Sequence, residues 1–314
     1  MLMTVIMNDV EQSYTEVEND IATRDRLHKQ VNDKLFYADD TIIMAKTAGA
    51  VEMMLQKIEV ESNKYSLRLN KTKCVHIQMK AIDRIHFTDG EAVPIHTQTD
   101  YLGGKIKNTA DHKPEIQNRI TATWATLRKL DLLWGNSNAS IKWKIRVYDA
   151  VIVAKVLYGL ESIPLTKADG RKLDAFQMKG LRKILKIKNP YWSRVSNEKL
   201  LEMTNDKLKL ENEDKPLRRL SERIIDRQIT LYAHVIRANE DDPMKKISID
   251  ETGERIKADF RRPGHPRIKW YDTTRKHIIN KLKMEGILPQ DEDRLLNRQE
   301  INSIIVNCAI ERYI

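Results

Sequence analysis

Two short apolar segments meet at a pair of adjacent acids in Lys34-Leu35-Phe36-Tyr37-Ala38-Asp39-Asp40-Thr41-Ile42-Ile43-Met44-Ala45. Strand-forming residues on both sides of a short polar turn are typical of a β-hairpin. Many hairpin turns simply carry solvated acids, but here the flanking residues are almost wholly apolar. We therefore expect the two acids to stand at the end of buried strands.

Adjacent carboxylates on a rigid hairpin are suited to holding divalent metal ions. Nucleotidyl transfer spreads negative charge over an attacking and a leaving oxygen, and two Mg²⁺ ions about 3.5 to 4 Å apart can hold both. Carboxylate oxygens are ligands that Mg²⁺ prefers. Because neighbouring strand residues point to opposite faces, we expect Asp39 to be the metal ligand and Asp40 an auxiliary charge.

The sequence around this hairpin mixes helices and strands as far as about residue 110 and is helical beyond it. Apolar spacing predicts helices at 1–30, 49–66, 112–134, 139–159, 167–186, 196–204, 215–238 and 271–284. Alternation predicts strands at 74–79, 85–87, 93–95 and 101–106. The fold class is therefore α+β, a small antiparallel sheet with helices followed by an all-helical region.

Phe36-Tyr37-Ala38-Asp39-Asp40 resembles the metal-binding palm hairpin of reverse transcriptases, especially those of non-LTR (LINE-like) retrotransposons. Two further motifs follow in the order of that family. Ser66-Leu67-Arg68-Leu69-Asn70-Lys71-Thr72-Lys73 resembles the next palm motif, and Tyr101-Leu102-Gly103 resembles the primer-grip hairpin. The helical remainder resembles the thumb and C-terminal region, with looser matches at 227–229, 234–235 and 262–270.

This resemblance implies a partial palm at 1–107, a helical thumb-like region at 108–245 and a basic C-terminal region at 246–314. It implies an RNA-directed DNA polymerase that uses a two-metal Mg²⁺ site, an RNA template, a DNA primer and dNTP. The same likeness places the protein inside the cell, in the nucleus or cytoplasm. No apolar run approaches the ~20 residues that span a bilayer, so we expect no membrane partner.

Individual roles follow from the same resemblance. Asp39 and Asp40 would bind the catalytic metal pair, and Tyr37 would lie near the primer terminus. Lys73 would approach the leaving pyrophosphate as a general acid or a point charge, with Lys71 as the competing candidate and a solvated loop as the alternative for both. The primer strand would be positioned by Tyr101, Leu102 and Gly103, although a purely structural hairpin explains Leu102 and Gly103 equally well.

The chain is basic, with a net charge of +10 and a pI near 9.3, which suits a polyanionic partner. Four cations recur at helical spacing, and they are Lys179, Arg182, Lys183 and Lys186. They form either the solvent-exposed side of an amphipathic helix or a surface that binds the template-primer backbone. A second basic cluster combines cations with aromatics, which fits phosphate contact plus base stacking. Its members include Arg255, Lys257, Arg261, Arg262, Arg267, Lys269 and Trp270.

The sequence departs from the family at its start. A complete enzyme has fingers and an upstream palm strand that carries another catalytic aspartate, and no aspartate before Asp39 lies in a strand-like context. We expect a truncated product or fragment with little polymerase activity of its own, which another chain carrying the missing upstream half could complete. We also expect an exposed hairpin edge and exposed apolar surface.

Composition restricts the alternatives. Two distant cysteines, Cys74 and Cys308, give neither a Cys-rich zinc site nor a secreted disulfide framework, and they favour a reducing compartment. The main rival function is a non-catalytic basic protein that binds nucleic acid. A helical protein-interaction scaffold with an accidental motif is the third reading.

Overall fold

The computed structural model describes residues 34–38, 40–45, 47–79, 83–109, 113–136, 138–211, 216–249, 269–290 and 298–312. The helix predicted at 1–30 lies outside these residues. The chain forms two compact units, Met1–His112 and Lys113–Ile314, and each is described by itself. The predicted α+β class is confirmed, because the first unit holds hairpins and a helix and the described part of the second is helical.

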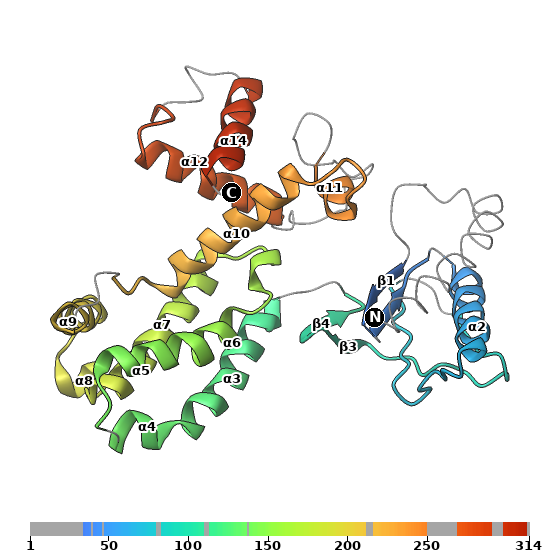
Figure 1. The fold of residues 1–314 in the computed structure, drawn as a ribbon, viewed down its shortest axis with the longest axis horizontal. Coiled ribbons are helices and arrows are strands. Elements are labelled where there is room, and N and C mark those ends of the chain that lie inside the picture. The colour runs from blue at the N-terminus through green and yellow to red at the C-terminus, as the bar shows by residue number, and fades with distance from the viewer. Residues whose placement is uncertain are drawn as a thin grey trace. The chain divides into compact units, whose positions relative to one another are not determined.

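The first unit contains two separate two-stranded antiparallel sheets (Figure 1). β1 (Lys34–Tyr37) pairs with β2 (Asp40–Ile43), and β3 (Gln98–Tyr101) pairs with β4 (Gly104–Lys107). The hairpin predicted around the paired acids is therefore present, and Tyr101-Leu102-Gly103 also lies in a hairpin. The single strand predicted at 101–106 is wrong, because Leu102 and Gly103 form the turn between β3 and β4. Between the two hairpins in sequence lies α2 (Ala48–Lys64), which begins where the Thr47 hydroxyl accepts a hydrogen bond from the Ala50 amide at 3.3 Å.

Helix α2 carries the small core of this unit on two of its sides. Met54 and Ile58 are buried against a group that includes Ile43, Leu67 and Leu69. The other side of the helix, including Ala48 and Leu55, packs against Ile85, Phe87 and Val93. This packing ties β2 to the helix and fixes the end of the first hairpin's second strand relative to residues 67–69.

The prediction of strands at 74–79, 85–87 and 93–95 is wrong, because these segments do not form regular strands. These segments are joined only by isolated bridges, His76 to Ile95 in parallel and His86 to Ala92 in antiparallel sense. One physical reason is Pro94, which has no amide hydrogen with which to extend a ladder. Another is the tight turn at Gly90, whose φ of +86° reverses the chain after a single pair.

The expectation that the acids stand at the end of buried strands is also wrong. Leu35 is 42% exposed and Tyr37 is 63% exposed, while Ile42 and Ile43 are half-buried. A two-stranded sheet has no neighbouring strand on either edge, and α2 reaches it from β2. Exposed apolar surface on this hairpin was the second expectation, and these side chains confirm it.

The second unit is helical throughout its described residues. The first group of helices covers residues 113–210, and the second group follows from residue 220. The first comprises α3 (Lys113–Lys129), α4 (Asp131–Asn136), α5 (Ile141–Val147), the π-helix η1 (Tyr148–Val153), α6 (Ala154–Leu157), the 3-10 helix η2 (Leu160–Ser162), α7 (Lys167–Leu185), α8 (Pro190–Ser193) and α9 (Asn197–Leu210). The second comprises α10 (Leu220–Arg237), α11 (Pro243–Ser248), α12 (Trp270–Met284) and α14 (Arg298–Arg312).

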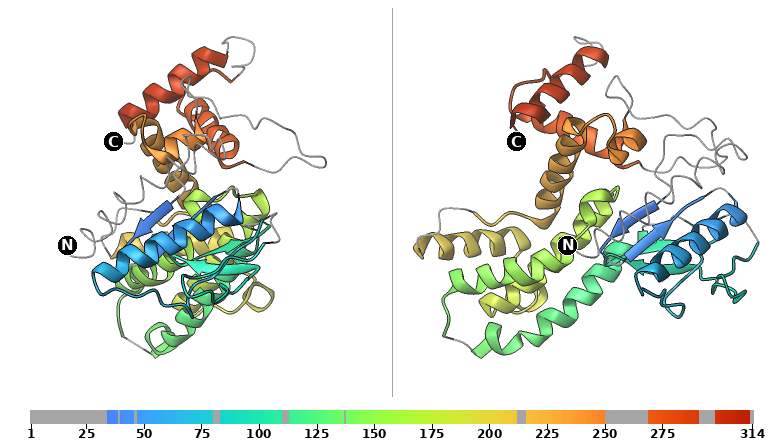
Figure 2. Two further views of the ribbon diagram at one scale, coloured as in Figure 1. Left: turned by 90° about the vertical axis from the view of Figure 1, so that its right-hand side faces the viewer. Right: turned by 45° about the vertical axis from the view of Figure 1, so that its right-hand side comes forward.

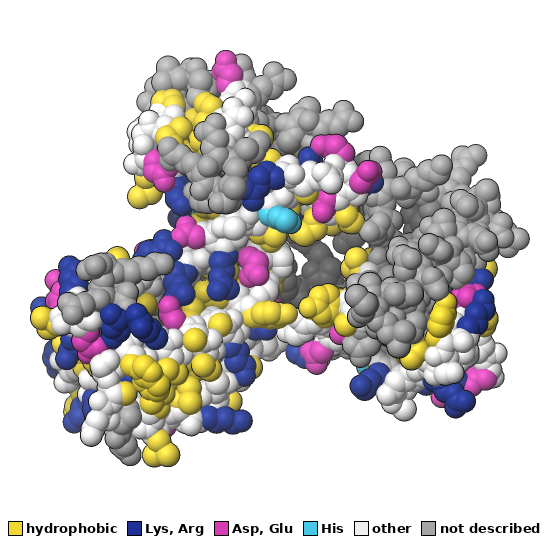
Figure 3. Space-filling view, in the orientation of Figure 1, with side chains coloured by type: hydrophobic (Ala, Val, Ile, Leu, Met, Phe, Trp, Pro, Cys, Tyr) yellow, Lys and Arg dark blue, Asp and Glu magenta, His cyan; other side chains and the backbone are white. Residues whose placement is uncertain are grey.

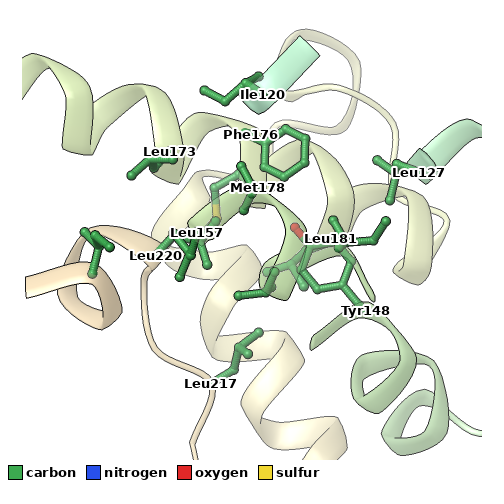
Figure 4. Close-up of a cluster of buried hydrophobic side chains, with 14 of the residues drawn as sticks. Ile120, Leu127, Tyr148, Leu157, Leu173, Phe176, Met178, Leu181, Leu217 and Leu220 are labelled. Carbon is green, nitrogen blue, oxygen red and sulfur yellow. The ribbon is translucent and has the colours of Figure 1, made fainter. Parts of the chain in front are cut away.

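Local signals explain where the central helix α7 begins and ends. Thr166 and Asp169 form a capping box at its start, each satisfying the other's backbone amide. Lys186 closes the helix in the left-handed conformation, with φ of +57°. Its apolar side, with Leu173, Phe176 and Leu181, lies in the middle of the first helical core (Figure 4).

Helix α10 belongs to two cores in succession. Leu220 and Ile224 are buried in the first core, whereas Ile229, Tyr232 and Val235 are buried in a second core with α12 and α14. In the further views α10 runs from the helices of the first core toward those of the second (Figure 2). The change of core thus falls inside a helix. No described helix is both long and apolar enough to cross a lipid bilayer.

Candidate metal and nucleic-acid site

The β1–β2 hairpin turns over two residues, because Tyr37 and Asp40 are cross-strand partners. Ala38, the first turn residue, has a φ of +54°, which is typical of the turns that suit the twist of a hairpin. Asp39 is the second turn residue in sequence and lies outside the described residues. Tyr37 and Asp40 are both exposed, so their side chains are accessible at the end of the ribbon.

The carboxylate of Asp40 forms no ion pair within the described part of the chain, and it is therefore available to a ligand. Its charge is nevertheless felt by a residue of the second hairpin. Burial raises the pKa of Tyr101, and the negative charge of Asp40 raises that pKa further. Such an effect requires proximity, so the two motifs, distant in sequence, converge in one place within the first unit.

The β3–β4 hairpin also turns over two residues, Leu102 and Gly103, and Tyr101 is paired with Gly104. Both turn residues have positive φ, +46° and +76°, which is the pattern of a type I′ turn. Leu102 is exposed. The left-handed backbone conformation that it adopts is costly for a residue with a side chain. Tyr101 is half-buried, and Asp100 beside it pairs with Lys105 at 2.7 Å.

The two candidate lysines of the middle motif lie in different surroundings. Lys71 pairs with Asp89 and with Glu91, and its ammonium lies 4.7 Å from the centre of the Phe87 ring. The hydrogen bond that Lys71 donates to Asp89 raises the pKa of Lys71. Lys73 is exposed, and we find no side-chain partner for it among the described residues. Of the two lysines, Lys73 is the one whose charge is free for a phosphate.

The basic stripe of α7 is not a uniform surface, and the prediction for Arg182 is wrong. Its side chain is 6% exposed and donates hydrogen bonds to the carbonyls of Lys188 (3.2 Å) and Val195 (2.8 Å). It also donates to Ser193 Oγ and Asn197 Oδ1. A buried guanidinium needs such acceptors, so Arg182 organises the loop that follows α7 and does not face a nucleic acid.

The other three residues of this stripe remain on the surface, and they are Lys179, Lys183 and Lys186. Lys179 is exposed, with its ammonium 6.0 Å from the ring centre of Trp124. Lys183 pairs with Asp131 of α4. On the visible face of the helical unit, Lys and Arg side chains are interspersed with acidic and hydrophobic ones (Figure 3). The surplus of positive charge is therefore spread over that face and does not form a single positive patch there.

The stacking role of Trp270 stays a prediction, and the structure shows where its indole lies. Its indole Nε1 donates to the Glu161 carbonyl at 2.6 Å, and its ring centre lies 6.2 Å from that of Tyr232. It is half-buried against the second core, so the ring serves packing. Lys269, at the N-cap of α12, is exposed. Arg261, Arg262 and Arg267 lie outside the described residues.

The hairpin acids are the candidate metal ligands of this chain. Within the described ranges no three His, Cys, Asp or Glu side chains are grouped so that they could hold a metal ion. Asp40 offers exposed oxygen atoms of the kind that Mg²⁺ prefers, and Asp39 precedes it in sequence. These residues fit part of a magnesium site.

Comparison with known proteins gives one informative relative. No protein family and no solved structure matches the chain. The chain is 25% identical over 142 residues to an uncharacterized transposon-derived protein of Caenorhabditis elegans. That alignment covers 43% of this chain and 50% of the relative, so the chain spans about half the length of the curated relative it matches.

Proposed function

We propose that this chain is part of a retrotransposon reverse transcriptase, an RNA-directed DNA polymerase, and contributes its metal-binding hairpin and its primer-grip hairpin. The observation that carries the proposal is that both motifs form two-residue hairpin turns within one compact unit. The effect of the Asp40 charge on the pKa of Tyr101 supports the assignment of both hairpins to one polymerase active site. Similarity to a transposon-derived protein supports the same origin.

The proposed chemistry assigns each exposed group a task. Asp40, with Asp39, would hold Mg²⁺, which when bound offsets the charge of the attacking and leaving oxygens in nucleotidyl transfer. Tyr37 and the Tyr101 hairpin would position the end of the primer, since both border the Asp40 carboxylate. Lys73 would supply a positive charge to the departing pyrophosphate. An RNA template, a DNA primer and dNTP are the partners that this reaction requires.

A second candidate is a basic nucleic-acid-binding protein without catalysis, which the net charge of +10 favours. The two candidates differ in the hairpin. In the polymerase the carboxylates bind metal, whereas in a binding protein they would have no such task.

Metal-directed backbone cleavage separates these candidates. Fe²⁺ that occupies a Mg²⁺ site generates hydroxyl radicals in the presence of ascorbate and peroxide, and these cut the nearby backbone. We expect cuts around residues 37–40 and around residues 101–103, both suppressed by excess Mg²⁺. The double variant Asp39→Asn, Asp40→Asn should abolish both sets of cuts, because its amides carry no charge.

The matched control is Asp100→Asn. Asp100 is an exposed acid of the neighbouring hairpin, but its charge is already paired with Lys105, so cleavage should persist in this variant. Cuts that are unaffected by the double variant, or that appear at other places, would remove the metal site and leave the binding protein as the better reading. Because the resemblance implies a further upstream aspartate, the readout is metal binding and not DNA synthesis.

A further inference from the structure

Two large aromatic side chains are exposed side by side on the short helix α8. Tyr191 is 69% exposed and Trp192 is 70% exposed. Their ring centres lie 5.0 Å apart, and their planes are at 89° to each other. Large aromatics contribute most of their free energy through burial or through binding, so an exposed pair indicates a surface that something else covers.

Positively charged residues flank this pair in sequence, and negative charge is absent from its segment. Residues 186–197 include Lys186, Lys188 and Arg194 and contain no aspartate or glutamate. All three cations are exposed, and the Arg194 guanidinium lies 5.7 Å from the centre of the Tyr191 ring. We call the five exposed residues Lys186, Lys188, Tyr191, Trp192 and Arg194 the α8 platform.

The backbone beneath the platform is firmly held. The buried Arg182 donates to the carbonyls of Lys188 and Val195 on either side of α8. The Asn189 side chain caps the helix by accepting from the Trp192 amide at 3.2 Å. Ile187 and Val195 pack against the first helical core. A surface that is already ordered loses little conformational entropy on binding.

We propose that the α8 platform binds single-stranded nucleic acid, with bases stacked on Tyr191 and Trp192 and phosphates held by Lys186, Lys188 and Arg194. Every base presents an aromatic face, so stacking of this kind does not depend on sequence. Three exposed cations in a segment without acids match the phosphate backbone, which makes a polyanion the better partner than a protein surface. The site adds to the proposed function and uses none of the hairpin residues.

The test measures how the full chain binds a labelled oligothymidylate of about twelve nucleotides, a length within the site size of stacking surfaces. Trp192→Ala should weaken binding about tenfold at low salt, the loss expected for one stacked base. Tyr191→Ala should act in the same direction. Trp192→Phe should retain most of the affinity, because phenylalanine also stacks, while the fluorescence quenching caused by the oligonucleotide should fall.

Two controls separate stacking from general effects. Leu210→Ala removes another highly exposed apolar side chain, 83% exposed on α9, and should leave binding unchanged. A duplex of equal length has no free base faces, so Trp192→Ala should not alter duplex binding. All variants should melt at the temperature of the parent, since each replaced side chain is exposed.

The proposal is wrong if Trp192→Ala and Tyr191→Ala bind the oligonucleotide as the parent does, or if single strand and duplex lose affinity equally. It is also wrong if these variants keep their affinity but lose a self-association seen by sedimentation, because the platform would then contact protein. The double variant Asp39→Asn, Asp40→Asn should not change this binding. Failure at the platform and failure at the hairpin are therefore distinguishable.

Discussion

Gly180 lies directly against Tyr148 inside the first helical core. A Cβ atom at position 180 would stand 2.7 Å from the Tyr148 Cε2 and 2.8 Å from its hydroxyl. The ring is fully buried, and burial raises the pKa of Tyr148. The tyrosine therefore has no room to retreat, and the absence of a side chain at 180 is a packing requirement.

Gly180→Ala is accordingly expected to destabilise the helical unit by about 1 to 3 kcal/mol, the range for overpacking a closed core. The midpoint of urea unfolding measures the effect. Gly135→Ala is the matched control, because position 135 is also helical but has open space around it. If both variants unfold at the same urea concentration, the close approach of Gly180 to Tyr148 is not limiting.

Arg182 gives a second prediction at this scale. Arg182→Ala leaves several buried acceptors without a donor, and one such loss costs about 1 to 3 kcal/mol. We expect a clear fall in thermal stability, together with weaker oligothymidylate binding because the α8 platform loses its support. Lys179→Ala, an exposed change on the same helix, should leave the melting temperature unchanged. A melting temperature for Arg182→Ala equal to the parent's would contradict the structural role.

Single residues also show where sequence reasoning stops. The spacing of Lys179, Arg182 and Lys183 predicts one helical stripe, and all three do lie on α7. Periodicity cannot report that the acceptors for Arg182 come from residues up to fifteen positions later, at 188–197. The same limit holds for Trp270, since its hydrogen-bond partner, the Glu161 carbonyl, is remote in sequence.

At the scale of elements, α9 and α5 are joined by one carboxylate. Glu211, just after α9, accepts hydrogen bonds from the Ile141 and Lys142 amides at the start of α5, at 3.0 and 2.7 Å. Burial raises the pKa of Glu211, but these hydrogen bonds together outweigh it and hold the pKa below the usual 4.5. The carboxylate form is therefore the one that stabilises the fold.

A pH dependence follows from the sign of this shift. A carboxyl group with a lowered pKa stabilises the folded state above its unfolded pKa, and this contribution is lost as the pH falls through the folded value. Glu211→Gln should lower the melting temperature at pH 7, and the difference from the parent should shrink below about pH 4.5. Glu202→Gln, on α9, is the control. A difference that does not change with pH would refute the charged cap.

Elements with strong local signals were the predictable part of the fold. α2, α7 and α12 lie within two residues of their predicted ranges, and the β1–β2 hairpin follows from strand-forming residues around a turn. The short helices α8 and α11 and the helix α14 were not predicted. The range 139–159 holds α5, η1 and α6 in succession, because its hydrogen bonding shifts to a π-helix that apolar spacing does not reveal.

The candidate site was predictable to a similar degree. The residues around the turns of both hairpins were singled out from sequence motifs, and the structure places both motifs at two-residue turns. Their functional roles stay predictions. The α8 platform was not identified, although Lys186-Ile187-Lys188-Asn189-Pro190-Tyr191-Trp192-Ser193-Arg194 places two adjacent aromatics between cations. These side chains can bind a ligand only if they are exposed, and their exposure depends on the tertiary fold.

For the whole molecule, the net charge of +10 gives a prediction about ionic strength. A chain that contacts several phosphates should lose affinity for nucleic acid steeply as salt rises, by tenfold or more between roughly 50 and 200 mM. Titrations of an RNA–DNA hybrid at several salt concentrations give the slope. An affinity that is flat across this range would favour a protein-interaction scaffold over both nucleic-acid functions.

Because α10 packs in both helical cores, the positions at which this chain can be truncated are limited. Division after residue 245, the predicted end of the thumb-like region, would leave Ile229, Tyr232 and Val235 on a helix stripped of α12 and α14. Three newly exposed apolar side chains on one unpacked helix would promote aggregation. A soluble piece of the helical unit must therefore either keep residues up to the last helix or carry polar replacements along the far half of α10.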